Sequence, residues 1–221
     1  MKIISALTFC ATMIPACGET PPATPSEKAK PLVLLAGDDL KGWKVIEEMK
    51  DHGPVSLKEG VLTLGAGKPM TGIVYAGKPE ALPVKDYEVT FEARRTSGSD
   101  FFGALTFPVR NLKTCATLVL GGWGGKCVGI SSLNYQSADE NETTNWIDFE
   151  NNRWYKIRLE VRENALRGWI DEKIVFDVST EEKRISMRFG DIELCQPLGL
   201  ATYLSEGEIK GLQIKPLPPA A

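Results

Sequence analysis

Apolar and polar residues alternate along two long segments of the chain. In segment 87–94 (YEVTFEAR) every second residue is apolar, and segment 155–162 (YKIRLEVR) repeats the pattern. A period of two puts successive side chains on opposite faces of an extended chain, so both segments are predicted to be half-buried β-strands. Shorter apolar runs separated by turn residues predict ten further strands, at 55–57, 61–64, 72–75, 103–107, 116–120, 128–132, 166–170, 174–178, 199–203 and 209–214.

The spacing of these strands indicates the fold class. No segment after residue 31 has the apolar spacing of a long amphipathic helix. About a dozen short strands without βαβ alternation predict an all-β fold, an antiparallel sandwich or jelly roll of two packed sheets. The chain shows no internal repeat, so we expect one folded domain, at 32–217.

Charge and composition narrow the chemistry. The formal net charge is -3, which is too weak and of the wrong sign to hold a polyanion, so nucleic acid is not expected as a partner. His52 is the single histidine, which excludes most zinc-hydrolase sites. Any chemistry is expected to depend on carboxylates, Arg, Lys or Tyr.

The first residues have the features of an export signal. Met1 and Lys2 precede a mostly apolar run that is too short to span a bilayer, and segment 14–18 (IPACG) resembles the lipobox of bacterial lipoproteins. We therefore expect a signal peptide at 1–16, lipidation at Cys17 and a Pro-rich tether at 17–31. The domain is expected to be lipid-anchored in the bacterial cell envelope, facing the periplasm or the cell surface, with simple secretion as the alternative.

Three cysteines fall in the predicted domain, namely Cys115, Cys127 and Cys195. Cys115 and Cys127 flank the segment 121–125 (GGWGG), and a hairpin centred on Gly121 brings them opposite each other for a cross-strand disulfide. Small buried thiols are the alternative.

A series of short motifs carries a family resemblance. Segment 34–43 (LLAGDDLKGW) resembles the opening of the 3-keto-disaccharide hydrolase domain family. Further matches to that family follow in order, at 60–62 (GVL), 87–89 (YEV), 153–158 (RWYKIR), 169–171 (WID), 197–201 (PLGLA) and 212–215 (LQIK). The resemblance covers nearly all of the predicted domain and implies a concanavalin A-like, or laminin-G-like, two-sheet sandwich.

The resemblance also implies an activity, the cleavage of glycosides oxidised at C3 of the sugar. A ketone at C3 acidifies the C2 proton, so a positioned base can form an enolate and expel the C1 substituent, after which water adds back. Such a site needs a base and a group that stabilises the enolate. A divalent cation beside the C3 oxygen would serve as an electrophile.

The chain departs from the family pattern at two places. Segment 199–207 (GLATYLSEG) lacks the histidine that many members carry there, and segment 116–120 (ATLVL) contains no acidic residue. A non-catalytic, lectin-like carbohydrate-binding module is therefore the alternative to an enzyme. A scaffold domain with no sugar site is a third interpretation, and it predicts a buried Trp123.

Candidate site residues concentrate between 101 and 150. Trp123, with Gly122 and Gly124 beside it, is expected to lay its indole against a sugar face, with a tight turn around a buried Trp as the alternative. The polar segment 134–150 carries acids without any Lys or Arg, so one is expected to act as base or several to bind a hard cation; a solvated acidic loop is the alternative. The expected bases are Asp139, Glu140 and Glu142.

The remaining candidates are arginines and amides. Arg94 or Arg110 is expected to stabilise the enolate, and a strand-end arginine is also able to pair with Asp100 in solvent. The amide side chains expected to contact a glycan are Asn134, Asn141 and Asn145.

Overall fold

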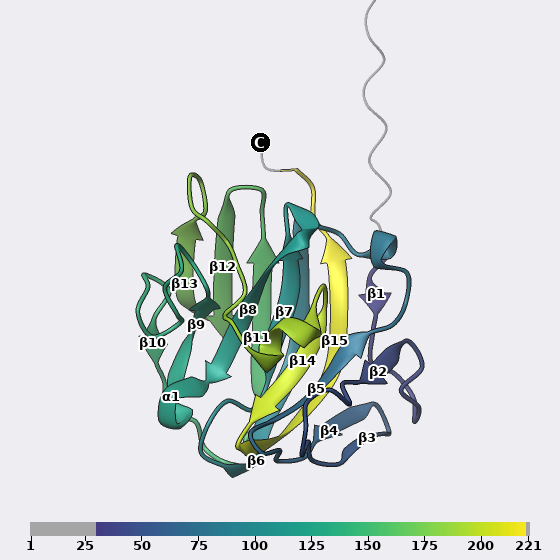
Figure 1. Cartoon of the computed structure of the whole chain (residues 1–221). Helices are drawn as coiled ribbons and strands as arrows, with labels where there is room; N and C mark the ends of the chain where they lie inside the picture. Colours follow the sequence, from purple (N-terminus) through teal and green to yellow (C-terminus); the bar gives the residue numbers. More distant parts are fainter. Residues whose placement is uncertain (1–29, 220–221) are drawn as a thin grey trace, which may run out of the picture.

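The computed structural model describes residues 30–219, which form two antiparallel β-sheets (Figure 1). The eight-stranded sheet contains β1 (Leu32–Val33), β3 (Val55–Lys58), β4 (Val61–Leu64), β6 (Tyr87–Gly98), β11 (Tyr155–Val161), β12 (Ala165–Ile170), β13 (Lys173–Ser179) and β15 (Ser205–Pro216). The seven-stranded sheet contains β2 (Trp43–Val45), β5 (Met70–Tyr75), β7 (Ala104–Val109), β8 (Asn111–Gly121), β9 (Cys127–Ser131), β10 (Asn145–Trp146) and β14 (Gly199–Tyr203).

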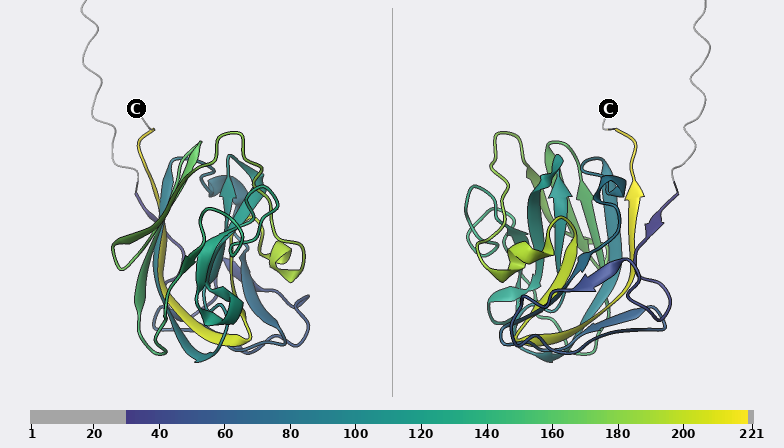
Figure 2. Two further views of the ribbon diagram at one scale, coloured as in Figure 1. Left: turned by 90° about the vertical axis from the view of Figure 1, so that its left-hand side faces the viewer. Right: turned by 45° about the vertical axis from the view of Figure 1, so that its right-hand side comes forward.

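The strand order connects distant parts of the chain. The eight-stranded sheet runs β13-β12-β11-β6-β15-β4-β3 with β1 on β15, and the seven-stranded sheet runs β10-β9-β8-β7-β14-β5-β2. Figure 2 shows the sheets as two curved layers. Three short helical turns complete the structure: η1 (Pro79–Ala81), α1 (Gly122–Gly125) and η2 (Asp191–Cys195). The predicted all-β, concanavalin A-like two-sheet sandwich is confirmed.

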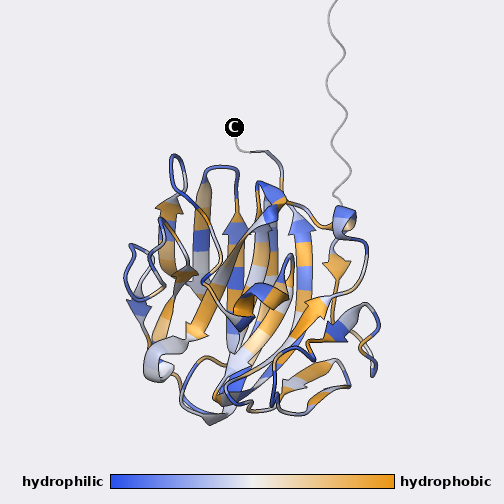
Figure 3. Ribbon diagram, in the orientation of Figure 1, coloured by the Kyte–Doolittle hydropathy of each residue, from blue (hydrophilic) through white to orange (hydrophobic). Residues whose placement is uncertain are grey.

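The core lies between the two sheets and follows from the alternation. On β6 the apolar residues Tyr87, Val89 and Phe91 face inward, while the polar residues between them are half exposed. Figure 3 shows the resulting alternation of apolar and polar segments along the strands. The facing sheet contributes Phe107 and Leu118, among others, to the same cluster. Removing this apolar surface from water is the main force that holds the layers together.

All twelve predicted strands are present, but three short ones were not predicted. These are β1, β2 and β10, of two or three residues each. A segment of that length is too short to show a periodicity, and its pairing with a neighbour defines it instead. The predicted signal segment 1–16, Cys17 and most of the tether 17–31 lie outside the described residues.

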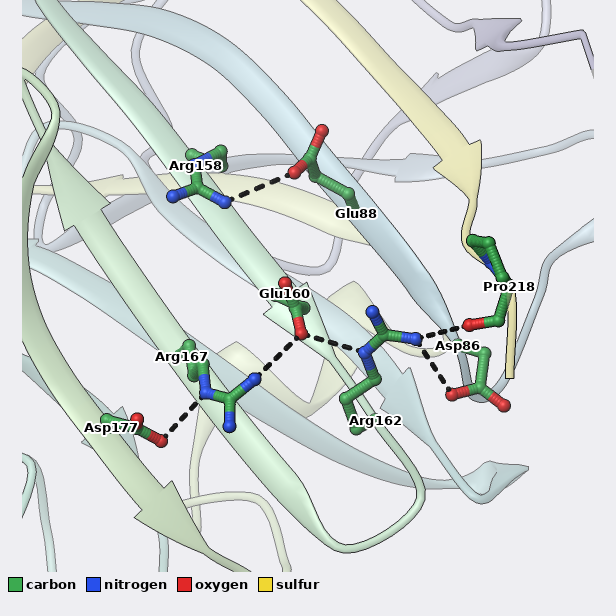
Figure 4. Close-up of polar contacts among 8 residues, drawn as sticks. All are labelled: Asp86, Glu88, Arg158, Glu160, Arg162, Arg167, Asp177 and Pro218. Carbon is green, nitrogen blue, oxygen red and sulfur yellow. Dashed lines mark hydrogen bonds and ion pairs between the residues drawn. The ribbon is translucent and has the colours of Figure 1, made fainter. Parts of the chain in front are cut away.

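Ion pairs cover the outer face of the eight-stranded sheet. Glu160 on β11 accepts hydrogen bonds from Arg162 at 2.7 Å and from Arg167 at 3.2 Å (Figure 4). Burial alone would raise the pKa of Glu160, but the hydrogen bonds and charges of the two arginines lower it below its ordinary value. Among residues 30–219, no helix is long and apolar enough to cross a membrane.

Candidate functional site

A cavity of about 480 Å³ lies on the outer face of the seven-stranded sheet. Its floor includes Ala104, Thr117, Val119 and Ser131, which alternate along their strands with residues that face the core. Both faces of this sheet are therefore covered, one by the other sheet and one by loops and η2, which Figure 2 shows on the outside of the layer. A sheet face that is covered at its sides and open in the middle is a common place for a ligand site.

Two small apolar clusters form the walls of the cavity. One contains Met70 with Ile192 and Tyr203 packed against it, and the other contains Val119 with Trp123 packed against it. Phe101 contacts both clusters, and its ring centroid lies 5.5 Å from that of Tyr203. The cavity is thus lined by three aromatic side chains that other residues hold in place.

Asp100 is the carboxylate that is best anchored at this cavity. One of its carboxylate oxygens accepts a hydrogen bond from the backbone N–H of Phe101 at 2.8 Å, and the other accepts one from that of Gly124 at 3.2 Å. Ser205 binds the backbone of Asp100 on both sides, accepting from its N–H at 2.8 Å and donating to its carbonyl at 2.9 Å. A carboxylate has about four acceptor positions, so Asp100 keeps some for a ligand proton.

Arg188 brings a positive charge to the same cavity. Its guanidinium carbon lies 5.4 Å from the centroid of the Trp123 ring, and Nη1 donates to the hydroxyl of Ser137 at 2.6 Å. The indole and Ser137 orient the guanidinium while its other N–H groups stay available. Asp191 and the highly exposed Phe189 complete this side of the rim.

The turn that carries Trp123 is built around positive φ angles. Gly121 (φ +77°), Trp123 (φ +48°) and Gly125 (φ +96°) all lie in the left-handed region, which glycine adopts without strain. A Cβ on Gly125 would lie 2.7 Å from Nη1 of Arg95, so the residue type is also dictated by a close contact. Trp123 is half-buried, with its ring beside the cavity, which contradicts the interpretation of a fully buried tryptophan.

The structure brings together one group of the predicted site residues. Trp123 lines the cavity, and its neighbours Gly122 and Gly124 lie next to Asp100. Arg94 and Arg110 are placed elsewhere. Arg94 is on the outer face of the eight-stranded sheet, where it pairs with Glu208 at 2.6 Å.

Arg110 is held by two loop residues, one between β11 and β12 and one directly after β13. Its guanidinium donates to the carbonyl oxygens of Glu163 and Thr180. Neither residue lines the cavity, and the arginine that lies near Trp123 there is Arg188.

The acidic segment 134–150 is folded, and most of its polar groups stabilise that fold. Asn141 is buried and its Nδ2 donates to the carbonyl oxygen of Ile130 at 2.8 Å. Asn134 accepts from the backbone N–H of Arg184 at 2.8 Å, and Asn145 donates to the carbonyl of Val175 at 3.2 Å. None of these three amides lines the cavity.

The three predicted bases also lie outside the cavity lining. Glu142 pairs with Lys183, and Glu140 accepts from the backbone N–H of Ser137 at 3.4 Å. One carboxylate oxygen of Asp139 is buried and has no hydrogen-bond partner. Burial, together with the nearby carboxylates of Asp139 and Asp100, raises the pKa of the Cys127 thiol to about 12.

The predicted Cys115–Cys127 disulfide is wrong. Both thiols are free and buried, as is Cys195. The pairing of β8 with β9 sets Thr117 opposite Ser131 and Leu120 opposite Val128, so the hairpin is centred at Gly124 rather than at Gly121. That register moves the two cysteines six positions apart along the ladder, roughly 20 Å at about 3.3 Å per residue.

A divalent cation was considered as an electrophile for this reaction, with the cofactor left unknown. Within residues 30–219, no group of three or more His, Cys, Asp or Glu side chains is arranged to hold a metal ion. The carboxylates of the cavity, Asp100 and Asp191, therefore do not form such a group.

Sequence reasoning missed Asp100 and Arg188 as site residues. Asp100 follows a Ser/Gly turn and was considered only as an ion-pair partner, and Arg188 falls in a segment with no predicted element. The residues are 88 positions apart, and only the tertiary structure brings them to one cavity. A local signal did exist for Trp123, because four glycines surround it.

Comparison with known proteins agrees with the fold. No protein-family model matches the sequence, and no curated protein matches it either. The structure is similar to the apo Crh5 transglycosylase, with a TM-score of 0.55 and 12% identity over 88% of this chain and 90% of that one. The same transglycosylase in complex with NAG gives a TM-score of 0.54 at 12% identity, covering 88% of this chain and 90% of that chain.

A second similar structure is a sialidase. It matches with a TM-score of 0.53 and 12% identity over 83% of this chain and 19% of the sialidase. At such identities the similarity shows only a shared fold, a two-sheet β-sandwich. No family model supports the family resemblance of the sequence motifs.

Proposed function

We propose that this protein binds a carbohydrate in the cavity on the outer face of the seven-stranded sheet. The observation that carries the proposal is that Phe101, Trp123 and Tyr203 line a cavity that also contains hydroxyl and charged side chains. Aromatic faces pack against the C–H groups of a sugar ring, while hydroxyl and charged groups bind its oxygens. The cavity volume of about 480 Å³ falls within the usual range for small-ligand sites.

The activity we propose for this cavity is the cleavage of 3-keto-glycosides. The sequence motifs that resemble the 3-keto-disaccharide hydrolase family support it, and so does the presence of Asp100 and Arg188 in one cavity. This pair takes the roles that the sequence had suggested for Asp139, Glu140 or Glu142 and for Arg94 or Arg110.

In the proposed reaction Asp100 removes the proton at C2 of the keto sugar. The electrons of the C2–H bond pass toward the C3 carbonyl, and the guanidinium of Arg188 stabilises the resulting enolate oxygen. The enolate then re-forms the ketone with a C1=C2 double bond, while the C1–O bond breaks and the aglycone leaves with a proton. Water adds across the double bond, so the net reaction is a hydrolysis.

Non-catalytic binding is the second candidate function. It is favoured by the absence of a histidine from segment 199–207, which corresponds to β14 and the start of β15. Tyr203 occupies the end of that strand and presents an aromatic ring to the cavity. Such a protein would hold a glycan as a lectin does.

The experiment that separates the two functions is incubation of the purified protein with 3-keto-glycosides and their unoxidised parents. Release of the aglycone is followed with and without added divalent cation, and tryptophan fluorescence reports binding. Release from the keto sugars alone supports the enzyme. Saturable fluorescence change without release supports the binding module, and the absence of both signals refutes carbohydrate binding for these sugars.

The proposed location is the bacterial cell envelope, with the domain tethered to the membrane through a lipid on Cys17. The proposal rests on the lipobox-like segment 14–18 and the Pro-rich segment that follows. Metabolic labelling with a fatty-acid analogue tests it, and a Cys17→Ser variant that still incorporates the label contradicts it.

A further inference from the structure

A row of three hydroxyl side chains crosses the outer face of the seven-stranded sheet, and two of them, Thr117 and Ser131, line the cavity. Thr106 on β7 lies directly opposite Thr117 on β8, and Thr117 lies opposite Ser131 on β9. All three residues alternate with core-facing neighbours, so their side chains share the outer face of the sheet. They are nearly inaccessible to solvent, with exposed fractions of 0%, 2% and 3%.

Two members of this row bind each other, and the third binds nothing. The hydroxyl oxygens of Thr106 and Thr117 are 3.1 Å apart, and Thr117 also contacts the sulfur of Met187 at 3.8 Å. The hydroxyl of Ser131 is buried without any hydrogen-bond partner. Buried hydroxyls in folded proteins nearly always have a partner, so each exception needs a physical explanation.

The position of Ser131 supplies that explanation. Among the side chains of residues 30–219, three buried polar atoms lack a partner, on Ser131, Asp139 and Thr202. Of these three residues, Ser131 alone lines the cavity. Ser131 is therefore the residue of the cavity floor whose hydroxyl has no partner within the described part of the protein.

The loop that covers this end of the sheet does not offer a substitute partner. Thr143 accepts from the backbone N–H of Ile130 at 2.8 Å and donates to Asn141 at 2.6 Å. Asn141 donates in turn to three backbone carbonyls, including that of Ile130. These polar groups, which bind the backbone of the preceding residue Ile130, are already used within the protein.

We propose that Ser131 is a specificity-determining residue whose hydroxyl donates a hydrogen bond to an oxygen of the bound sugar. This inference rests on the proposed carbohydrate-binding function and deepens it. The ligand class is a sugar ring with a hydroxyl or keto oxygen on the carbon that reaches the floor, and the corresponding deoxy sugar is rejected. A site built to bind an oxygen discriminates strongly against an analogue that lacks it, because its own polar group then stays unpaired.

The test compares the wild-type protein with Ser131→Ala. The probes are methyl glucoside, its 3-keto form and its 2-, 3-, 4- and 6-deoxy forms, with Kd from tryptophan fluorescence. The wild type is expected to bind one deoxy form about tenfold more weakly than the parent glucoside. Ser131→Ala is expected to bind the parent and that deoxy form equally, and more weakly than the wild type binds the parent. Thr202→Val is the matched control, because it removes an unpartnered buried hydroxyl outside the cavity, and it should keep the wild-type pattern.

Two results overturn the inference while leaving the proposed function intact. One is an unchanged preference of Ser131→Ala between the parent and the deoxy forms. The other is a wild type that binds the parent and every deoxy form equally well. Absence of binding of all probes to the wild type instead refutes the proposed function, and the inference falls with it.

A second measurement does not depend on any sugar. If the Ser131 hydroxyl has no partner in the empty cavity, Ser131→Ala should leave the urea midpoint of the ligand-free protein unchanged or raise it. A clear fall in the midpoint, with Thr202→Val unaffected, shows that the hydroxyl is bound within the protein and overturns the inference.

Discussion

Arg95 donates a hydrogen bond from Nη1 to the carbonyl oxygen of Gly125 at 3.2 Å, so a strand of one sheet holds the turn of the other that carries Trp123. The same guanidinium donates to Asn151 at 2.7 Å and to the carbonyl of Phe149 at 3.0 Å. Burial lowers the pKa of Arg95, because desolvation disfavours its charged form. The cavity wall thus depends on a buried cation that lies beneath it.

Replacing this arginine should destabilise the protein. Arg95→Met removes three hydrogen bonds from a charged donor and leaves buried carbonyls unpaired, so the free energy of unfolding should fall by about 3 kcal/mol. Urea unfolding measures the change. Arg94→Met, on the opposite face of the same strand, is the control and should cost clearly less. Equal losses in the two variants would contradict the role given to Arg95.

Removing the indole of Trp123 should weaken sugar binding. Trp123→Ala takes one aromatic wall from the cavity, and the affinity for the sugars bound by the wild type should fall about tenfold or more. Trp146→Ala is the control, because Trp146 is exposed on β10 and does not line the cavity. Titration followed by calorimetry avoids the loss of a fluorescent probe. Unchanged affinity in Trp123→Ala would place the site elsewhere.

Asp100 should carry the proposed chemistry. Asp100→Asn keeps the shape and one of the two acceptor oxygens, and so loses one backbone hydrogen bond; because it cannot take the C2 proton, aglycone release from a 3-keto-glycoside should fall about 100-fold or more. Binding of the same sugar should persist. Glu140→Gln changes a predicted base outside the cavity and should keep the wild-type rate. A rate loss confined to Glu140→Gln would restore the acidic segment as the source of the base.

Stability should depend on pH through Glu160. Because its pKa is lowered in the folded protein, the stabilisation is present above the unfolded-state pKa and is lost as the pH falls through the folded-state pKa. Glu160→Gln should reduce the free energy of unfolding at pH 7 by about 1–2 kcal/mol and flatten its decline at acidic pH. Urea unfolding from pH 7 to pH 3 measures both. Glu163→Gln, in an exposed pair with Lys85, should behave almost as the wild type.

The thiols of the folded part should be unreactive until the protein unfolds. Burial raises the pKa of Cys115 to about 11 and that of Cys195 to about 12, which leaves almost no thiolate at neutral pH. These three thiols, with that of Cys127 included, should therefore not react with an aromatic disulfide reagent in buffer and should react when the protein is unfolded in guanidinium. The urea midpoint should be the same with and without reductant. A lower midpoint in reductant would indicate a disulfide after all.

The strand pattern and the site differ in how much of each was predictable. Every predicted strand is present because alternation, or a short apolar run between turn residues, is a local property of three to eight residues. The register of β8 and β9 is not local, and it displaced the hairpin centre from Gly121 to Gly124. Trp123 was recognised because its glycine neighbours are a local signal. Asp100 and Arg188 are far apart in the sequence, and no local pattern shows that they line the same cavity.

The sequence by itself determined the two-sheet sandwich, because about a dozen short apolar strands without intervening helices can bury their apolar faces only against each other. Only the tertiary structure decided which polar residues meet. Arg94 and Arg95 are adjacent, yet the pleat sends the first to the outer surface and the second beneath the Trp123 turn. The cavity likewise forms where separate segments cover one sheet face, and such contacts depend on distances in space that no local pattern encodes.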